Sequence, residues 1–314
     1  MHVVKEVTII PDFSRELYWW RRLQKGNILA FKALINGYSQ LLFSFGSKHV
    51  PDAELVKNCV QELFLDIWDG RESLTATAGI KTYLFGLLRR KIQRSLIARQ
   101  GALQSLADPA HFSVEFTLEA GLTEDEPART VVDTLRQLIE QLSQRQQEVV
   151  YLKYFQELNC DQIAEVASLS SPAVSELLQT AIRQVKSQWK VVFSAQPTPP
   201  NIEKLLWNES FRKWVLKPTS ESDAFWHCWR ISNPERVADL KLARTVVSAL
   251  QVRDRQMPTS EQQVLVTQTL AQIKVPVQRT YSFFFRWQPA NWSVFTELLV
   301  SLAKRSRKNK ASLS

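Results

Sequence analysis

The basic and aromatic side chains of residues 71–100 are the first candidates for chemistry in this sequence. This stretch contains seven Lys or Arg residues and one acidic residue, with Tyr83 and Phe85 interleaved. Basic groups neutralise phosphates, and aromatic rings stack on unpaired bases. A helix predicted from about Ile80 to Arg99 would carry these groups, which indicates contact with a nucleic acid. A solvated basic face with two core aromatics is the alternative interpretation.

A second candidate for nucleic-acid contact is a helix-turn-helix pattern in the middle of the chain. Apolar spacing predicts helices at about Ser143 to Phe155, Asp161 to Ala167 and Ser171 to Trp189. The turn falls at Ser168-Leu169-Ser170, and Pro172 lies in the first turn of the last helix, where proline is tolerated. In this motif the N-terminal part of the last helix enters the major groove of DNA.

The last helix of this pattern separates into an apolar and a polar face. Val174, Leu177 and Leu178 are expected to close the core over Ile163 and Ala164. Gln179 could read a base edge, and Arg183 or Lys186 could hold a phosphate. Ser168 occupies the turn position that favours glycine, at a cost of about 1 kcal/mol. A three-helix packing module without DNA contact is the alternative interpretation.

A third feature is an amphipathic helix that precedes the basic one. Asp52 is a good N-cap and Gly70 a good terminator. Between them, steps of three and four place five apolar side chains on one face. These apolar residues are Val56, Val60, Leu63, Phe64 and Ile67. The opposite face presents Lys57, Gln61, Glu62 and Asp66.

The composition favours a soluble all-α protein of two or three domains. The chain has 314 residues, only 8 Gly and 13 Pro, and a formal charge of +9, which fits a polyanionic partner. Its 3 Cys and 4 His are scattered, so neither a disulfide framework, a metal site nor another cofactor is expected. The start lacks a signal-peptide core, and no segment is expected to approach the roughly 20 apolar residues of a membrane helix, so a cytoplasmic location is expected.

Changes of composition along the chain predict six regions. The acidic run at 124–126 and the stretch SAQPTPPN at 194–201 mark linkers. The regions are a helical unit at 12–99, a linker at 100–127, the helix-turn-helix unit at 128–190, a Pro-rich linker at 191–203, a Trp-rich helical segment at 204–252 and an irregular basic tail at 253–314.

The two front units, in this order, resemble the small extracytoplasmic-function sigma factors of the sigma-70 superfamily. DAELVKNCVQELFLDIWDGRESL resembles their core-binding helix of region two, and IKTYLFGLLRRKIQRSL resembles the following promoter-melting helix. The segment from Leu142 to Trp189 resembles region four. The resemblance covers about residues 12–190 and implies two partners, core RNA polymerase and promoter DNA.

The resemblance also implies a role for three sets of residues. Core polymerase would bind Gln61, Glu62, Phe64, Asp66 and Trp68. The minus-ten promoter element would contact Lys81, Tyr83, Arg89, Arg90, Lys91 and Arg94. The minus-thirty-five element would contact Ser170, Ser171, Ala173, Ser175, Glu176, Gln179, Arg183 and Lys186. Many relatives have Asn and Asp where this chain has Arg90 and Arg94, so its base pocket would differ.

The Trp-rich segment from Leu205 to Leu250 resembles the cytoplasmic N-terminal part of FecR-type anti-sigma regulators. The resemblance rests on aromatic positions, an Asn233-Pro234-Glu235 break and Ala243-Arg244. It implies an intramolecular contact between sigma and anti-sigma parts that either inhibits or assists the front units. The docking residues would be Phe211, Trp214, Phe225, Trp226 and Trp229. A small aromatic core of their own is the alternative for these residues.

Two other functions remain open on the sequence alone. One is a helix-turn-helix regulator that never joins polymerase, which would not need the helix at 52–68. The other is a sequestering module whose sigma-like part has lost DNA binding, an idea that Arg90 and Arg94 keep open. An enzyme is not expected, because the sequence shows no phosphate loop, nucleophile elbow or recognisable carboxylate pair.

Overall fold

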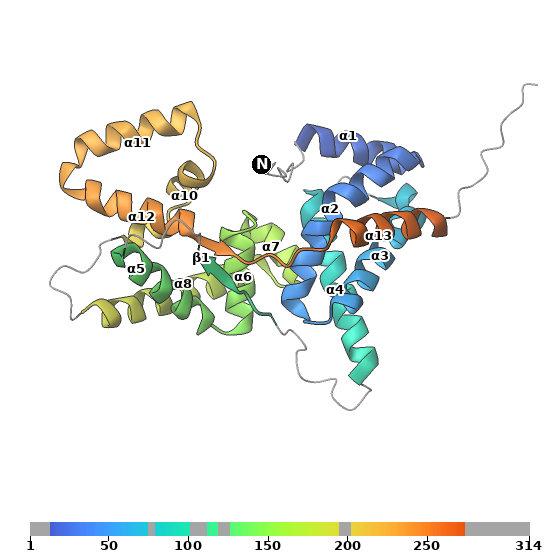
Figure 1. Cartoon of the computed structure of the whole chain (residues 1–314), viewed down its shortest axis with the longest axis horizontal. Coiled ribbons are helices and arrows are strands. Elements are labelled where there is room, and N and C mark those ends of the chain that lie inside the picture. The colour runs from blue at the N-terminus through green and yellow to red at the C-terminus, as the bar shows by residue number, and fades with distance from the viewer. Residues whose placement is uncertain (1–12, 75–78, 101–111, 119–125, 195–201, 274–314) are drawn as a thin grey trace, which may run out of the picture. The chain divides into compact units, whose positions relative to one another are not determined.

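The computed structural model describes residues 13–74, 79–100, 112–118, 126–194 and 202–273 (Figure 1). Helices make up nearly all of these residues, and the predicted all-α class is confirmed. The exception within the described residues is a pair of three-residue strands, β1 (Phe116–Leu118) and β2 (Leu250–Val252).

The first helical unit, called the front bundle below, contains four helices. They are α1 (Phe13–Gln24), α2 (Ile28–His49), α3 (Ala53–Asp69) and α4 (Ile80–Gln100). Apolar positions on α2 and α3 meet through aromatic rings, with Phe31 centred 5.0 Å from Trp68 and 6.3 Å from Phe64. The predicted caps of α3 are confirmed, because the Asp52 side chain accepts a hydrogen bond from the Leu55 backbone and the helix ends at Gly70.

Helix α2 is the core helix of the front bundle. It packs against α1, α3 and α4, and its apolar side chains are largely buried. By length and composition alone it could cross a membrane, with 22 residues from Ile28 to His49. The sequence-based view that no segment approaches this length was therefore wrong. The burial of 56% of its most apolar window fits a core helix of a folded bundle.

The second unit, called the rear bundle below, contains the predicted helix-turn-helix. Its helices are α5 (Glu126–Glu140), α6 (Gln144–Tyr154), α7 (Cys160–Ala167) and α8 (Ser171–Phe193). Capping boxes begin α6 at Ser143 and α7 at Asn159, and each satisfies backbone donors that the first turn leaves free. Ser168 adopts the expected left-handed backbone, with φ 56° and ψ 47°.

The chain between the two bundles is more ordered than the predicted linker. Phe112, Val114 and Phe116 are buried, and β1 follows directly. Strand β1 pairs antiparallel with β2, in the register Phe116 to Val252 and Leu118 to Leu250. Alternating apolar residues before a three-residue strand give too short a pattern for sequence-based prediction.

Residues 202–273, called the C-terminal segment below, are mostly helical. The helices are α9 (Glu203–Leu206), α10 (Glu209–Leu216), α11 (Ser220–Ser232), α12 (Val237–Ala249) and α13 (Thr259–Gln272). The prediction of an irregular tail from residue 253 was wrong for α13. Its sequence has weak helical periodicity, and its buried residues Leu265, Val266 and Thr269 acquire their order from tertiary packing. The rest of that predicted tail, 274–314, lies outside the described residues.

We expect Ser168→Gly to raise the free energy of unfolding by up to about 1 kcal/mol, because glycine adopts a left-handed backbone without a Cβ penalty. Part of this gain is offset by the greater freedom of glycine in the unfolded chain. Urea unfolding monitored by circular dichroism measures the change. Ser168→Val is the matched control and should destabilise the protein, since β-branched residues tolerate this backbone poorly. A glycine variant no more stable than the parent would contradict the strain argument.

Candidate functional site

The α3 surface predicted to bind polymerase divides into exposed and buried positions. Glu62 and Asp66 are exposed, and Gln61 is half-buried. Phe64 and Trp68 are each only 1% exposed and belong to the core of the front bundle. Phe64 was predicted to lie on the apolar face and does, whereas Trp68 was predicted on the accessible face and instead points toward Phe31 of α2. The accessible part of the predicted surface is a polar patch of Gln61, Glu62 and Asp66.

The basic helix α4 has one side chain in an unexpected environment, that of Arg89. Its guanidinium is 2% exposed, and its Nε and Nη2 donate to the two carboxylate oxygens of Glu148 at 2.6 and 3.2 Å. Glu148, on α6 of the rear bundle, is 1% exposed. In this arrangement Arg89 is not accessible to DNA, and its predicted contact with the minus-ten element stays a prediction. Arg89 neutralises a buried carboxylate of the other bundle, as a buried charge requires.

Two further basic residues of α4 are also engaged by the protein. Lys81 donates to the Gln156 carbonyl of the rear bundle at 2.9 Å, and burial lowers the pKa of its ammonium to about 8. Lys91 pairs with Asp66 at 2.7 Å and Glu62 at 3.5 Å, so it faces the polar patch of α3. The predicted minus-ten set is thus divided between several environments.

The remaining residues of that set lie nearer to solvent. Arg94 is exposed and Arg90 is half-buried. Tyr83 is half-buried with its ring edge-on to Trp20 at 5.8 Å, and burial raises the pKa of its hydroxyl. Within the predicted minus-ten set, these three side chains of α4 therefore remain accessible to a partner.

Helix α4 lies against α7, the first helix of the helix-turn-helix. Two glycines lie at this contact, and an added Cβ at either would make ordinary van der Waals contact with α7. A Cβ added at Gly86 would meet the Glu165 carbonyl at 3.6 Å, and one added at Gly79 would meet the Gln162 amide at 3.4 Å. The helix predicted to engage the minus-ten element is therefore partly covered by the unit predicted to read the minus-thirty-five element.

An aromatic cluster surrounds the Arg89–Glu148 pair and excludes water from it. Phe45 of α2 stacks on Phe85 at 4.2 Å and lies 6.4 Å from Tyr151 of α6. Phe112, from the chain between the bundles, packs against Tyr151 at 5.6 Å and His49 at 5.0 Å. The two bundles thus share one apolar core in this state.

The recognition helix α8 begins at the surface of the rear bundle. Ser170 is its N-cap and accepts from the Ala173 backbone, and Val174 and Leu178 close the core as predicted. Within the predicted minus-thirty-five set, Ser170, Glu176, Gln179 and Arg183 are exposed. The half-buried members are Ser171, Ala173, Ser175 and Lys186. Their role in reading DNA stays a prediction.

The C-terminal segment contacts the front bundle through α13 and the residues before it. Glu261 pairs with Lys57 of α3 at 2.9 Å, and Gln262 donates to Ser39 of α2 at 2.9 Å. Asp254 pairs with Lys48 of α2 at 2.8 Å. Leu265 and Val266 are buried where α13 crosses α2 and α3. This helix, which sequence analysis missed, carries the main contact with the front bundle.

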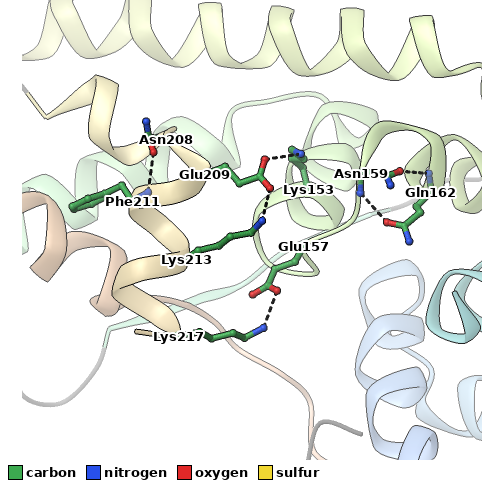
Figure 2. A network of polar contacts seen from close by, with 9 residues as sticks. All are labelled: Lys153, Glu157, Asn159, Gln162, Asn208, Glu209, Phe211, Lys213 and Lys217. Atoms are coloured by element: carbon green, nitrogen blue, oxygen red, sulfur yellow. Dashed lines mark hydrogen bonds and ion pairs between the residues drawn. The ribbon is translucent and has the colours of Figure 1, made fainter. Parts of the chain in front are cut away.

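The same segment contacts the rear bundle through α10 and the turn between α6 and α7 (Figure 2). Glu209 lies between Lys153 of α6 and Lys213 of its own helix, at 3.4 and 2.9 Å. Lys217 reaches Glu157 of the turn at 2.7 Å. Arg212 donates to the Tyr154 carbonyl at 3.0 Å, and burial lowers the pKa of its guanidinium to about 10. Charged groups dominate the part of the contact that α10 makes, while α12 packs against α5 and Trp207 lies edge-on to Tyr154 at 5.2 Å.

The five aromatic residues predicted to dock on the front units lie elsewhere. Phe211, Trp214 and Trp226 are buried against one another, with ring centroids 5.2 to 5.8 Å apart. Trp229 packs on Trp226 at 5.7 Å, and Phe225 is 59% exposed. The structure supports the alternative, a small core between α10, α11 and α12. Dense aromatic residues have the same sequence pattern in a core and at an interface, so sequence alone could not separate these cases.

Replacing Glu148 by Ala should weaken the contact between the bundles by about 3–5 kcal/mol, because Arg89 is left buried without a counter-charge. Chemical denaturation followed by hydrogen exchange at α4 and α6 measures the loss. The double variant Arg89→Met/Glu148→Leu should recover most of it, since an apolar pair of similar volume removes both charges. Arg94→Gln, on the exposed side of α4, is the control. An equal loss in the double variant would count against the ion pair as the cause.

The lowered pKa of Lys81 predicts that the free energy of unfolding depends on pH. The packed state favours the neutral amine, with a pKa of about 8 against 10.5 in the free chain. Between these values the unfolded chain binds more protons, so stability should increase with pH. We expect the unfolding free energy of the parent, minus that of Lys81→Met, to rise from about pH 7.5 to 9.5. A flat difference would show that Lys81 is solvated.

The helix-turn-helix is similar to a known protein family. Residues 138–187 match the family described as Sigma-70, region 4. The RNA polymerase sigma factor YlaC of Bacillus subtilis (strain 168) is 26% identical over 161 residues, which are 49% of this chain and 88% of YlaC. The solved structure of CnrH in complex with the cytosolic domain of CnrY is 17% identical, with a TM-score of 0.37, and the match covers 56% of this chain and 97% of that one. The chain is thus similar to the sigma-70 family in its helix-turn-helix and, more weakly, over about half of its length.

Proposed function

We propose that this chain is an alternative sigma factor of the extracytoplasmic-function class, whose C-terminal segment holds it in an inactive, closed state. The observation that carries the proposal is the packing of α4 on α7, joined to α6 by the buried pair of Arg89 and Glu148. In this role the protein binds core polymerase in the cytoplasm and directs it to specific promoters without catalysing a reaction itself.

The spacing of promoter elements supports the description of this state as closed. The minus-ten and minus-thirty-five elements are roughly 25 base pairs apart, which is on the order of 85 Å of B-form DNA at about 3.4 Å per pair. Helix α4 would engage the first element and α8 the second. Because α4 packs directly on α7, which α8 follows after a short turn, the two helices cannot span that distance. Promoter binding therefore requires the bundles to separate.

The position of α13 supports inhibition rather than assistance. Lys57, which pairs with Glu261, lies one helical turn from Gln61 on α3, so both are on the same stripe. The exposed carboxylates of Glu62 and Asp66 flank that stripe. A polymerase surface approaching the polar patch of α3 would meet α13 first. Binding to polymerase and packing of α13 would then compete.

The resemblance to FecR-type segments agrees with a regulatory role for residues 202–273, although its contacts differ from those expected. The segment holds both bundles, through α13 on one and α10 on the other. The strand β2 adds a third attachment, to the chain between the bundles. A segment attached at three places opposes separation of the bundles, which is the change that promoter binding requires.

Disrupting α13 should increase the affinity for core polymerase, because only the open fraction of the protein binds. We expect Glu261→Lys to give up to about a five-fold gain, the scale of one exposed ion pair turned repulsive. Val266→Asp, which buries an unpaired charge, should give about ten-fold or more. Polymerase capture and run-off transcription measure both variants, beside a fragment of residues 1–195.

Glu235→Lys is the matched control, because it makes the same charge change at an exposed position of the C-terminal segment. It should behave like the parent. Unchanged capture in Val266→Asp and in the 1–195 fragment would remove the inhibitory role while leaving the sigma factor role intact. Failure of every form to bind core polymerase would remove the sigma factor role itself and favour a polymerase-independent DNA-binding protein.

A further inference from the structure

A cavity of about 400 Å³ lies where three separate parts of the chain meet. The end of α2 provides Ser44, Ser47, Lys48 and Pro51, and the residues before β1 provide Ser113 and Glu115. Arg253 and Arg255, between β2 and α13, complete the wall. The cavity thus joins the front bundle, the chain between the bundles and the C-terminal segment. Its size is within the range of small-molecule sites, about 300–1,000 Å³.

The wall of this cavity is cationic and polar. Among the described residues its lining has three basic side chains and the carboxylate of Glu115, with Pro51 as the one apolar side chain. Lys48 is already paired with Asp254 at 2.8 Å, so the positive charge offered to a ligand comes from Arg253 and Arg255. Arg253 and Glu115 approach to 3.7 Å with both side chains about 70% exposed, a weak pairing that leaves the guanidinium available. Arg255 donates from Nη1 to the Pro51 carbonyl at 2.7 Å, which uses one of its five donors.

Hydroxyl groups add hydrogen-bonding capacity to the cationic wall. Ser47 lines the cavity, and its Oγ is buried without a hydrogen-bond partner among the described residues, so it would face a ligand after rotation about its Cα–Cβ bond. The carbonyls at the end of α2 would repel an anion, but two of them are already satisfied. The Ser113 backbone donates to the Lys48 carbonyl at 2.9 Å, and Arg255 donates to the Pro51 carbonyl. The negative end of the helix is therefore partly masked.

We propose that this cavity binds a compact phosphorylated metabolite, such as a sugar phosphate. Arginine pairs bind phosphate through parallel N–H donors, and serine hydroxyls add further donors. No aromatic side chain lines the cavity, so a nucleobase would have nothing to stack on. The polar wall suits the hydroxyl groups of a small sugar instead.

The ligand would stabilise the closed state, an effect that rests on the function proposed above. Its site exists only while α2, the chain before β1 and the segment after β2 are together. A ligand that binds only the closed form shifts the equilibrium toward it, by a factor of one plus the ratio of its concentration to its dissociation constant. The metabolite would thus act as a co-inhibitor of polymerase binding.

Calorimetric titration of the full chain with ribose 5-phosphate tests the site. We expect saturable binding with one site per chain, and no binding of ribose. Arg253→Gln and Ser47→Ala should each weaken binding, the first by about ten-fold or more, as expected for the loss of a charged hydrogen-bonding partner. Arg230→Gln, an exposed arginine of α11 outside the cavity, should bind like the parent. Equal binding of sulfate at matched ionic strength would show general charge attraction and overturn the site.

Capture by core polymerase, with and without ribose 5-phosphate, tests the consequence. Capture by the parent should fall about ten-fold when the metabolite is ten times its dissociation constant, and capture by Arg253→Gln at the same concentration should fall by about two-fold or less. Unchanged capture despite saturable binding would overturn the co-inhibitor role. Absence of saturable binding would overturn the site whatever the polymerase assay gives. The proposed inhibition by α13 is judged separately, from ligand-free Val266→Asp.

Discussion

The ion pair between Arg89 and Glu148 determines how the two bundles can relate to each other. Removing two charges from water is costly, and the cost is offset only while both hydrogen bonds between them hold. Phe45, Phe112 and Tyr151 enclose the pair, so partial separation would leave charges dry and unpaired. Complete separation restores water to both groups. Under the proposed function, the bundles would therefore have two favourable arrangements, packed or fully apart.

The C-terminal segment is attached in a manner that suits release. Its contacts with the rear bundle through α10 are mainly ion pairs, and the side chains of Glu209 and Lys217 are 60% and 55% exposed. Helix α12 also packs against α5 of that bundle. Exposed ion pairs contribute little individually and are screened by salt. The attachment is strong through the sum of many contacts over α10, β2 and α13. A competitor that displaces one of these elements weakens the hold on the others, because all three belong to one short stretch of chain.

Local patterns in the sequence predicted the structural features that depend on residues close together in the chain. The Asp52 cap, the left-handed Ser168 and the buried positions of α3 and α8 all follow from spacing within a few residues. The pairing of Arg89 with a carboxylate 59 residues away leaves no local pattern, so a buried arginine looked like a DNA contact. Helix α13 was missed for the same reason, because the surface that orders it comes from α2 and α3.

The pairing of Lys57 with Glu261, 204 residues later, also affects the order in which contacts can form during synthesis. A ribosome adds roughly 5–20 residues per second, so the 72 residues from 202 to 273 follow the rear bundle by about 4–14 s. During that interval the newly made front and rear bundles lack their restraint. Each newly synthesised molecule would then have a brief period without the restraint of the C-terminal segment. The rate of translation sets the length of that period.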